Sequence, residues 1–214
     1  MAMLKSYVLV LPVATLCCLG CAPRGWGGLK GQPGDPDLMF QEGANRPPTA
    51  NTLYSMARIV RAQGKEGVYR FVLQRIIRDH PTFLPAYCDL AELEARQSRF
   101  DAAMETLAAG LRVSPGDPIL INDTGMCLLL MQAYEKSLEY FLKATTINPD
   151  DASYRANMAV ALGMMGRYDE SLSLYKQVVP ASEAHHNLGV ISSARKDLER
   201  AEKEFARARE LEQN

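Results

Sequence analysis

The sequence predicts an all-α fold, a right-handed α-solenoid of about five helical hairpins. The main observation is that Pro81, Pro115 and Pro149 recur with a constant spacing of 34 positions, each at the end of an apolar-periodic stretch. A fixed period of this kind is typical of stacked hairpins that bury their core between neighbours. The second observation is that apolar residues within each period recur at i, i+3, i+4 and i+7, which predicts amphipathic helices.

Residues 1–21 have the pattern of an export signal. Lys5 precedes a mostly apolar run that ends in Leu19-Gly20-Cys21, and the run is too short for a comfortable transmembrane helix. The ending resembles the lipobox of bacterial lipoproteins. That resemblance implies lipidation of Cys21 and an exported lipoprotein on a periplasm-facing membrane, with Ala22 favouring the outer membrane. An ordinary cleaved secretory signal and an uncleaved anchor are the alternatives.

Residues 22–49 are expected to form a flexible linker. Eleven of the positions from Ala22 to Ala50 are Gly or Pro, and such a composition neither sustains a helix nor buries a core. The segment therefore separates the lipidation site from the repeats.

Residues 50–214 hold the repeats, which begin at about 50, 84, 118, 152 and 182. In the second, a helix over 86–97 is followed by a return helix from Phe100, and Pro115 and Pro118 separate it from the third hairpin. Asp150-Asp151 is expected to cap the first helix of the fourth repeat.

The last two repeats depart from the period. Val179-Pro180 is expected to end the fourth return helix early, and Leu188-Gly189 follows Met158-Ala159 by 30 positions instead of 34. The final helix has Leu198, Ala201, Phe205, Ala208 and Leu211 on one face and charged residues on the other. The array is therefore expected to end without a separate capping helix.

Small residues recur where the two helices of a hairpin should touch, with a larger residue opposite. Examples are Gly125 with Phe141 and Ala159 with Tyr175. With the proline period, this pattern resembles the tetratricopeptide repeat (TPR), and with the signal it resembles bacterial TPR lipoproteins. The resemblance implies a concave groove, formed by the first helix of each hairpin, that binds protein or peptide partners.

The family's groove positions can be carried onto this sequence. They fall on Tyr54, Arg58, Arg61, Glu92, Arg96, Asn122, Met126, Leu129, Leu130, Ala156, Val160, Met164, His186 and Val190. The groove is then expected to be cationic near its N-terminal end and apolar, with methionines, in its middle. The alternative is that some of these apolar residues belong to the core between repeats.

The sequence shows no set of residues that predicts catalysis, a cofactor or a metal site. It lacks Gly-x-Ser-x-Gly, phosphate-loop and dinucleotide-binding motifs, and the adjacent His185 and His186 cannot both face one metal ion. Cys88 and Cys127 fall inside expected helices, where free cysteines usually act as small apolar side chains. The net charge of −1 argues against nucleic-acid binding.

Together these features favour a non-enzymatic, membrane-tethered scaffold or assembly factor that binds partner peptides in its groove. The resemblance to TPR lipoproteins points to secretion, pilus or envelope proteins as partners and to the lipid on Cys21 as the membrane attachment. Two alternatives remain open: a homo-oligomeric structural module of the cell envelope, and an enzyme with an unrecognised site in the groove.

Overall fold

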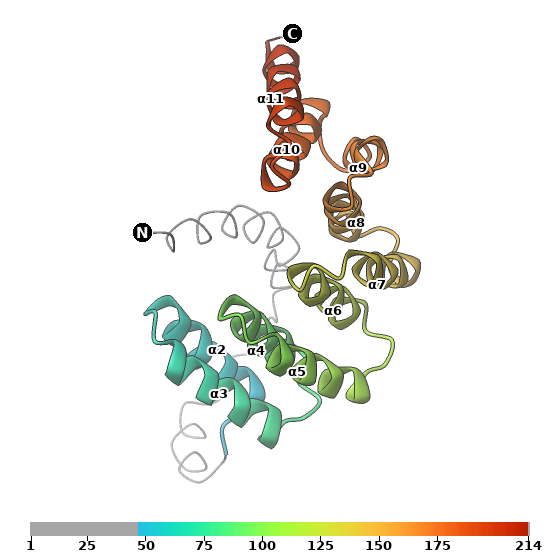
Figure 1. Ribbon diagram of the computed structural model, residues 1–214. Helices are drawn as coiled ribbons and strands as arrows, with labels where there is room; N and C mark the ends of the chain where they lie inside the picture. The colour runs from blue at the N-terminus through green and yellow to red at the C-terminus, as the bar shows by residue number, and fades with distance from the viewer. Residues whose placement is uncertain (1–46, 214) are drawn as a thin grey trace, which may run out of the picture.

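The computed structural model describes residues 47–213, and this region consists of five antiparallel helical hairpins (Figure 1). Hairpin 1 is α2 and α3, and hairpins 2 to 5 follow as α4/α5, α6/α7, α8/α9 and α10/α11. The helices are α2 (Ala50–Ala62), α3 (Glu66–Asp79), α4 (Pro85–Arg96), α5 (Phe100–Val113), α6 (Pro118–Leu130), α7 (Tyr134–Ile147), α8 (Ala152–Met164), α9 (Tyr168–Tyr175), α10 (Ala181–Ala194) and α11 (Leu198–Glu212). No strand occurs among these residues, so the all-α solenoid is confirmed.

The hairpins stack in chain order into a curved array, with α2/α3 and α10/α11 at opposite ends (Figure 1). Each second helix packs on the first helix of the following hairpin. First helices also contact each other directly, from α4 to α6, α8 and α10 in succession. The first helices therefore form the inner side of the curve.

Aspartates cap the first helices of hairpins 3 and 4. Asp117 Oδ1 accepts hydrogen bonds from the backbone N–H groups of Ile119 and Leu120, at 3.0 and 2.9 Å, and Pro118 occupies the first helical position. Asp151 caps α8 by accepting from the Ser153 N–H at 3.0 Å. These contacts satisfy amide groups that a helix leaves unpaired, and they confirm the capping role expected for Asp151.

Within a hairpin, the two helices approach closely where one of them carries a small residue. A Cβ atom on Gly125 would lie 2.7 Å from the Phe141 ring, and one on Gly189 would lie 2.7 Å from the Phe205 ring. These distances are too short for a real Cβ, so glycine is required for the aromatic ring to pack against the facing backbone.

The turn inside every hairpin has the same backbone conformation. Gly64, Ser98, Gln132, Gly166 and Lys196 all have positive φ, between 58° and 85°. Their successive spacings are 34, 34, 34 and 30 positions, so they occupy equivalent places in the repeat. Three of them are not glycine, although this left-handed conformation favours glycine.

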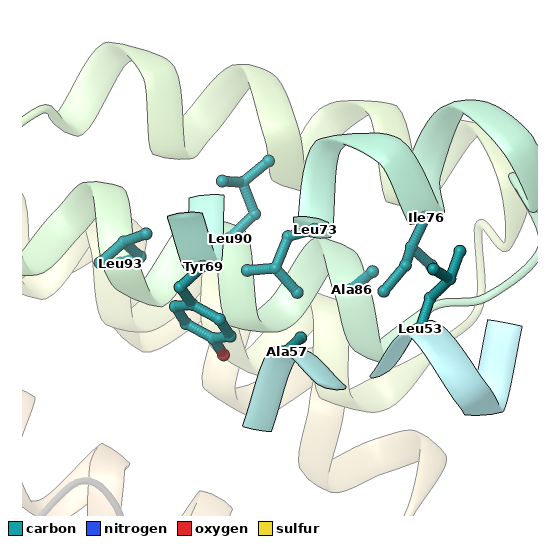
Figure 2. Packing of buried hydrophobic residues seen from close by; sticks show 8 residues of the cluster. All are labelled: Leu53, Ala57, Tyr69, Leu73, Ile76, Ala86, Leu90 and Leu93. Carbon is teal, nitrogen blue, oxygen red and sulfur yellow. The ribbon is translucent and has the colours of Figure 1, made fainter. Parts of the chain in front are cut away.

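The core between hairpins 1 and 2 illustrates how neighbouring repeats are held together. Side chains from α2, α3 and α4 interdigitate there: Leu53, Ala57, Tyr69, Leu73, Ile76, Ala86, Leu90 and Leu93 (Figure 2). All eight are buried. Since α4 contributes to the core of the hairpin before it, each hairpin depends on its neighbour for burial.

Hairpin 4 is the irregular member of the stack. Its second helix, α9, has 8 residues, whereas α3, α5 and α7 each have 14. A turn over residues 176–178 follows, and Pro180 precedes α10. The early end of the fourth return helix is as the Val179-Pro180 pair predicts.

Candidate binding groove

The inner surface begins with a small polar pocket between hairpin 1 and α4. The pocket has a volume of about 190 Å³ and is lined by Arg61, Gly64, Glu66, Tyr69, Asp89, Glu92, Leu93 and Arg96. Arg61 Nη2 lies 2.8 Å from Glu92 Oε1, and Arg61 Nη1 lies 3.9 Å from Asp89 Oδ1. Arg96 lies 3.7 Å from a Glu66 oxygen and 3.8 Å from a Glu92 oxygen.

This network corrects the expectation of a cationic N-terminal end. Arg61 and Arg96 are both predicted groove residues, and both are exposed. However, three carboxylates surround these two cations in the pocket, those of Glu66, Asp89 and Glu92. The positive charges are therefore largely neutralised within the protein. The sequence prediction includes Glu92 but misses Glu66 and Asp89, which come from register positions outside the family's groove set.

A row of polar contacts runs along the inner face and joins successive first helices. The Tyr54 hydroxyl donates to Asp89 Oδ2 at 2.9 Å, and Asn157 Nδ2 donates to Asn122 Oδ1 at 2.8 Å. Between these two contacts, the Cys88 thiol and the Asp123 carboxylate lie next to each other, and each affects the pKa of the other. We call these three contacts the inner ladder, with one rung at each of the first three joints between hairpins.

Each rung joins residues 35 positions apart: 54 to 89, 88 to 123 and 122 to 157. Each rung therefore joins the fifth position of one repeat to the sixth position of the next. The sequence therefore contains a signal for the rungs: pairs of polar residues separated by 35 positions, one more than the repeat length. The sequence prediction includes Tyr54 and Asn122 and misses Asp89, Asp123 and Asn157.

The ladder contains groups whose ionisation is shifted by burial. Burial raises the pKa of Asp123 to about 6, although hydrogen bonds from Cys88 and Asn122 oppose the shift. Burial also raises the pKa of the Cys88 thiol, with the negative charge of Asp123 as a further cause. The pKa values of Tyr54 and Tyr69 are raised by burial and by the Asp89 carboxylate, to which both hydroxyls donate. Near neutral pH the two tyrosines are hydrogen-bond donors, and Asp89 is their shared acceptor.

The middle of the inner face is apolar. Met126 and Leu130 on α6, Met164 at the end of α8 and Val190 on α10 are half-buried, so each keeps some apolar surface accessible. Ala156 on α8 is half-buried as well.

Two predicted groove residues are instead part of the core. Leu129 is 5% exposed and Val160 is 4% exposed, and both lie in a buried cluster with Phe141, Ala159 and Tyr175. These two positions therefore follow the alternative interpretation, in which apolar groove candidates belong to the core. On a helix packed on three sides, neighbouring apolar residues such as Leu129 and Leu130 cannot be separated into core and groove by hydropathy alone.

The C-terminal end of the inner face carries two adjacent histidines with different surroundings. His186 is exposed and its ring lies 5.4 Å from the Phe205 ring, centroid to centroid. His185 Nδ1 lies 2.7 Å from Glu204 Oε2, and both side chains are largely buried. The remaining predicted groove residue, Arg58 on α2, is exposed.

Within residues 47–213 no group of three or more His, Cys, Asp or Glu side chains is arranged to hold a metal ion. Cys88 and Cys127 are free thiols inside helices. Over the same residues, every helix is too short or too polar to cross a bilayer. The predicted lipidation site Cys21 and the linker over 22–49 lie outside this region, apart from the last three linker residues.

Comparisons with known proteins agree with this architecture. One tetratricopeptide repeat family profile matches residues 88–152, and a second matches residues 152–187. Among curated proteins, the chain is 24% identical over 183 residues to the human protein O-mannosyl-transferase TMTC1, which covers 82% of this chain and 20% of TMTC1. It is 30% identical over 81 residues to mouse superkiller complex protein 3, which covers 38% of this chain and 5% of that protein. The chain thus spans about a fifth or less of the length of these relatives.

Solved structures with the same fold include several TPR proteins. MamA from Desulfovibrio magneticus RS-1 has a TM-score of 0.60 at 16% identity, over 77% of this chain and 95% of that one. TTC0263 from Thermus thermophilus has a TM-score of 0.61 at 15% identity, over 76% and 91%. YrrB, described as a TPR protein with an unusual peptide-binding site, has a TM-score of 0.55 at 18% identity, over 77% and 87%. The two profiles show tetratricopeptide repeats over residues 88–187, and the hairpin stack has the fold of tetratricopeptide repeat proteins.

Proposed function

We propose that this chain is a membrane-tethered scaffold that binds a segment of a partner protein along the inner face of its repeat array. The observation that carries the proposal is the row of half-buried apolar side chains at the middle of that face: Met126, Leu130, Met164 and Val190. They come from three successive first helices, α6, α8 and α10, which contact one another in that order. Adaptable apolar surfaces of this type suit an amphipathic helix or an extended segment.

The chemistry of the partner follows from the rest of the face. The arginines of the N-terminal pocket form ion pairs with Glu92 and Glu66. A strongly acidic peptide would therefore gain little electrostatic binding free energy there. Asp123 adds a carboxyl group close to the apolar row. A segment whose apolar residues face α6, α8 and α10, with neutral or basic residues beyond them, therefore fits best. A peptide ligand is also supported by YrrB, which has the same fold and is described as having a peptide-binding site.

The membrane attachment in this proposal depends on Cys21. Its lipobox-like context and the Gly/Pro composition of residues 22–49 support a lipid-anchored array held away from a periplasm-facing bacterial membrane. Envelope proteins, including secretion or pilus assembly components, are then the accessible partner class.

The groove is tested by charge substitutions at half-buried positions, because Leu129 and Val160 would report on folding instead. We expect Leu130→Glu together with Met164→Glu to abolish capture of partners by in-cell crosslinking. The matched control is Leu142→Glu with Ile147→Glu on α7, where both residues are already exposed, and it should capture partners as the wild type does. Both proteins should keep wild-type circular dichroism. Undiminished capture by the groove variant would remove the proposal.

The same variants separate partner binding from self-association. If the wild-type protein sediments as a dimer that only the groove variant disrupts, the inner face binds a second copy and the alternative of a homo-oligomeric module is correct. The tether has its own test: Cys21→Ser should release the protein from the membrane fraction and change its mobility as an unlipidated protein. Retention in the membrane with unchanged mobility would exclude lipidation at Cys21.

A further inference from the structure

The face of α2 that points away from hairpin 2, at the N-terminal end of the stack, presents apolar side chains at positions that are largely buried in the other hairpins. Met56 is 53% exposed and Ile59 is 60% exposed. Their equivalents in hairpin 2, one repeat later, are Leu90 and Leu93, which are 5% and 3% exposed and pack against α3. The surface is therefore the stacking face of hairpin 1, and no hairpin among residues 47–213 packs on it.

The equivalent positions in the remaining hairpins strengthen this comparison. The equivalents of Ile59 are Leu93, Cys127, Ala161 and Ile191, and all four are at most 3% exposed. Because Met56 and Ile59 remain exposed, hairpin 1 lacks hydrophobic stabilisation that the other hairpins gain by burying apolar side chains at this stacking position. This face is therefore expected to be covered.

We propose that the chain covers this face itself, with Leu38-Met39-Phe40. Over residues 22–49 these three residues form the one run of consecutive large apolar side chains; the remainder is mostly Gly, Pro and polar residues. The run lies just upstream of the described region, whose first helix begins at Ala50. A role as a flexible spacer accounts for the glycines and prolines on both sides of the run. It does not account for three consecutive large apolar residues.

The distances allow this contact. Nine residues, 41–49, separate Phe40 from α2, and they span up to about 30 Å when extended. Met56 and Ile59 lie about 9 and 14 Å along the axis from the start of α2, at 1.5 Å per residue. The chain is also fixed where it enters the array, because His80 Nε2 lies 3.1 Å from the Pro48 carbonyl oxygen. From that point the upstream segment can turn back along α2.

A second copy of the chain fits the face less well. If copies stacked end to end, the face would meet the far side of hairpin 5. There, Ile77 of α3, which packs on the core shared with α4, has the exposed Arg209 as its equivalent. The C-terminal end therefore presents a charged side chain where end-to-end stacking needs an apolar one. Such stacking would place Met56 and Ile59 against a charged surface.

The direct test uses the full chain in its native host, with the photo-crosslinking residue benzoylphenylalanine in place of Met39. We expect an adduct within one chain that maps to α2, near Met56 and Ile59. The same probe in place of Trp26 is the control and should give no adduct on α2. A crosslinked dimer, an adduct with a different protein, or no adduct on α2 would each overturn the proposal.

A second measurement does not depend on crosslinking. Leu38→Ser, Met39→Ser and Phe40→Ser combined should speed amide hydrogen exchange in the middle of α2 at least tenfold, with hairpins 3 to 5 unchanged. The matched control is Asp35→Ser, Gln41→Ser and Glu42→Ser combined, which changes nearby polar residues and should leave exchange in α2 as in the wild type. Equal exchange in the apolar variant and the wild type would contradict the proposal, and because these residues precede the array, a folding defect cannot explain that result.

Discussion

The first three joints between hairpins differ from the fourth. Hairpins 1 to 4 follow in steps of 34 positions, and each joint carries one rung of the inner ladder. At the fourth joint the step is 30 positions, α9 is shorter than α7, and Ala156 stands where Asn122 stands in hairpin 3. Within residues 47–213 no 35-position rung joins hairpin 4 to hairpin 5; there, Arg195 after α10 donates instead to the Met164 carbonyl and to the Tyr168 hydroxyl. Hydrogen bonding along the inner face therefore depends on repeat length as well as on residue type, and the following predictions test that difference.

The largest effect is expected at the first joint. Asp89→Ala should lower the free energy of unfolding by about 4 kcal/mol, because the hydroxyls of Tyr54 and Tyr69 both lose their acceptor in a partly buried site. Chemical denaturation followed by circular dichroism measures this change. The control is Glu139→Ala, an exposed position on α7, which should have little effect. A loss equal to that of the control would show that the first rung is not structural.

The second joint should respond to pH. The folded pKa of Asp123 is about 6, above its ordinary value of 3.8, so the folded state binds more protons than the unfolded state between about pH 4 and 6. Stability from this group is therefore present at low pH and lost as pH rises. Asp123→Asn should gain stability relative to the wild type from pH 4 to pH 7, by up to about 3 kcal/mol. A stability difference that is constant over this range would contradict the shifted pKa.

The third and fourth joints can be compared with matched substitutions. Asn157 and Asn187 occupy equivalent positions and are each 5% exposed, but only Asn157 forms a rung. Asn157→Ala should therefore destabilise the protein by about 1 to 2 kcal/mol more than Asn187→Ala, since it also removes the hydrogen-bond donor of Asn122 Oδ1. Equal losses in thermal or chemical unfolding would mean that the rung contributes nothing beyond packing.

The smallest effect is expected inside the hairpins, where the joints do not matter. Gly64 and Ser98 have the same left-handed conformation, with φ of 70° and 58°. Gly64→Ala should destabilise the protein and Ser98→Gly should stabilise it, each by about 1 kcal/mol. A Cβ atom at Gly64 meets no other atom within 4 Å, so the backbone conformation alone is tested. Changes of the same sign in the two variants would contradict this explanation.

Much of the fold could be predicted from the sequence because the repeat imposes the same constraints several times. The prolines, the small residues such as Gly125 and the early stop at Pro180 each have a local physical cause, and the structure agrees with them. The family profiles agree with the resemblance to the tetratricopeptide repeat.

The composition of the inner face is harder to predict. The family's groove positions include Leu129 and Val160, but both side chains are buried. The same positions suggest a cationic surface at Arg61 and Arg96, because they include only one of the acidic partners, Glu92, and omit Asp89 and Glu66. Periodicity predicts the side of a helix on which a residue lies. Its ion pairs depend on which turns of neighbouring helices meet, and the sequence of one chain does not give this alignment of the helices.

The five similar left-handed turns have a consequence for the shape of the molecule. Because the same conformation recurs at Gly64, Ser98, Gln132, Gly166 and Lys196, the turn between the two helices is nearly the same in every hairpin. Differences in curvature must then arise in the connections between hairpins, and the most divergent connection is the segment from Lys176 to Pro180. A change in the length of this segment would rotate the last hairpin and move Val190 relative to Met164 without altering either residue. A change in the length of this loop can therefore alter the width of the groove, although the loop does not contact the bound partner.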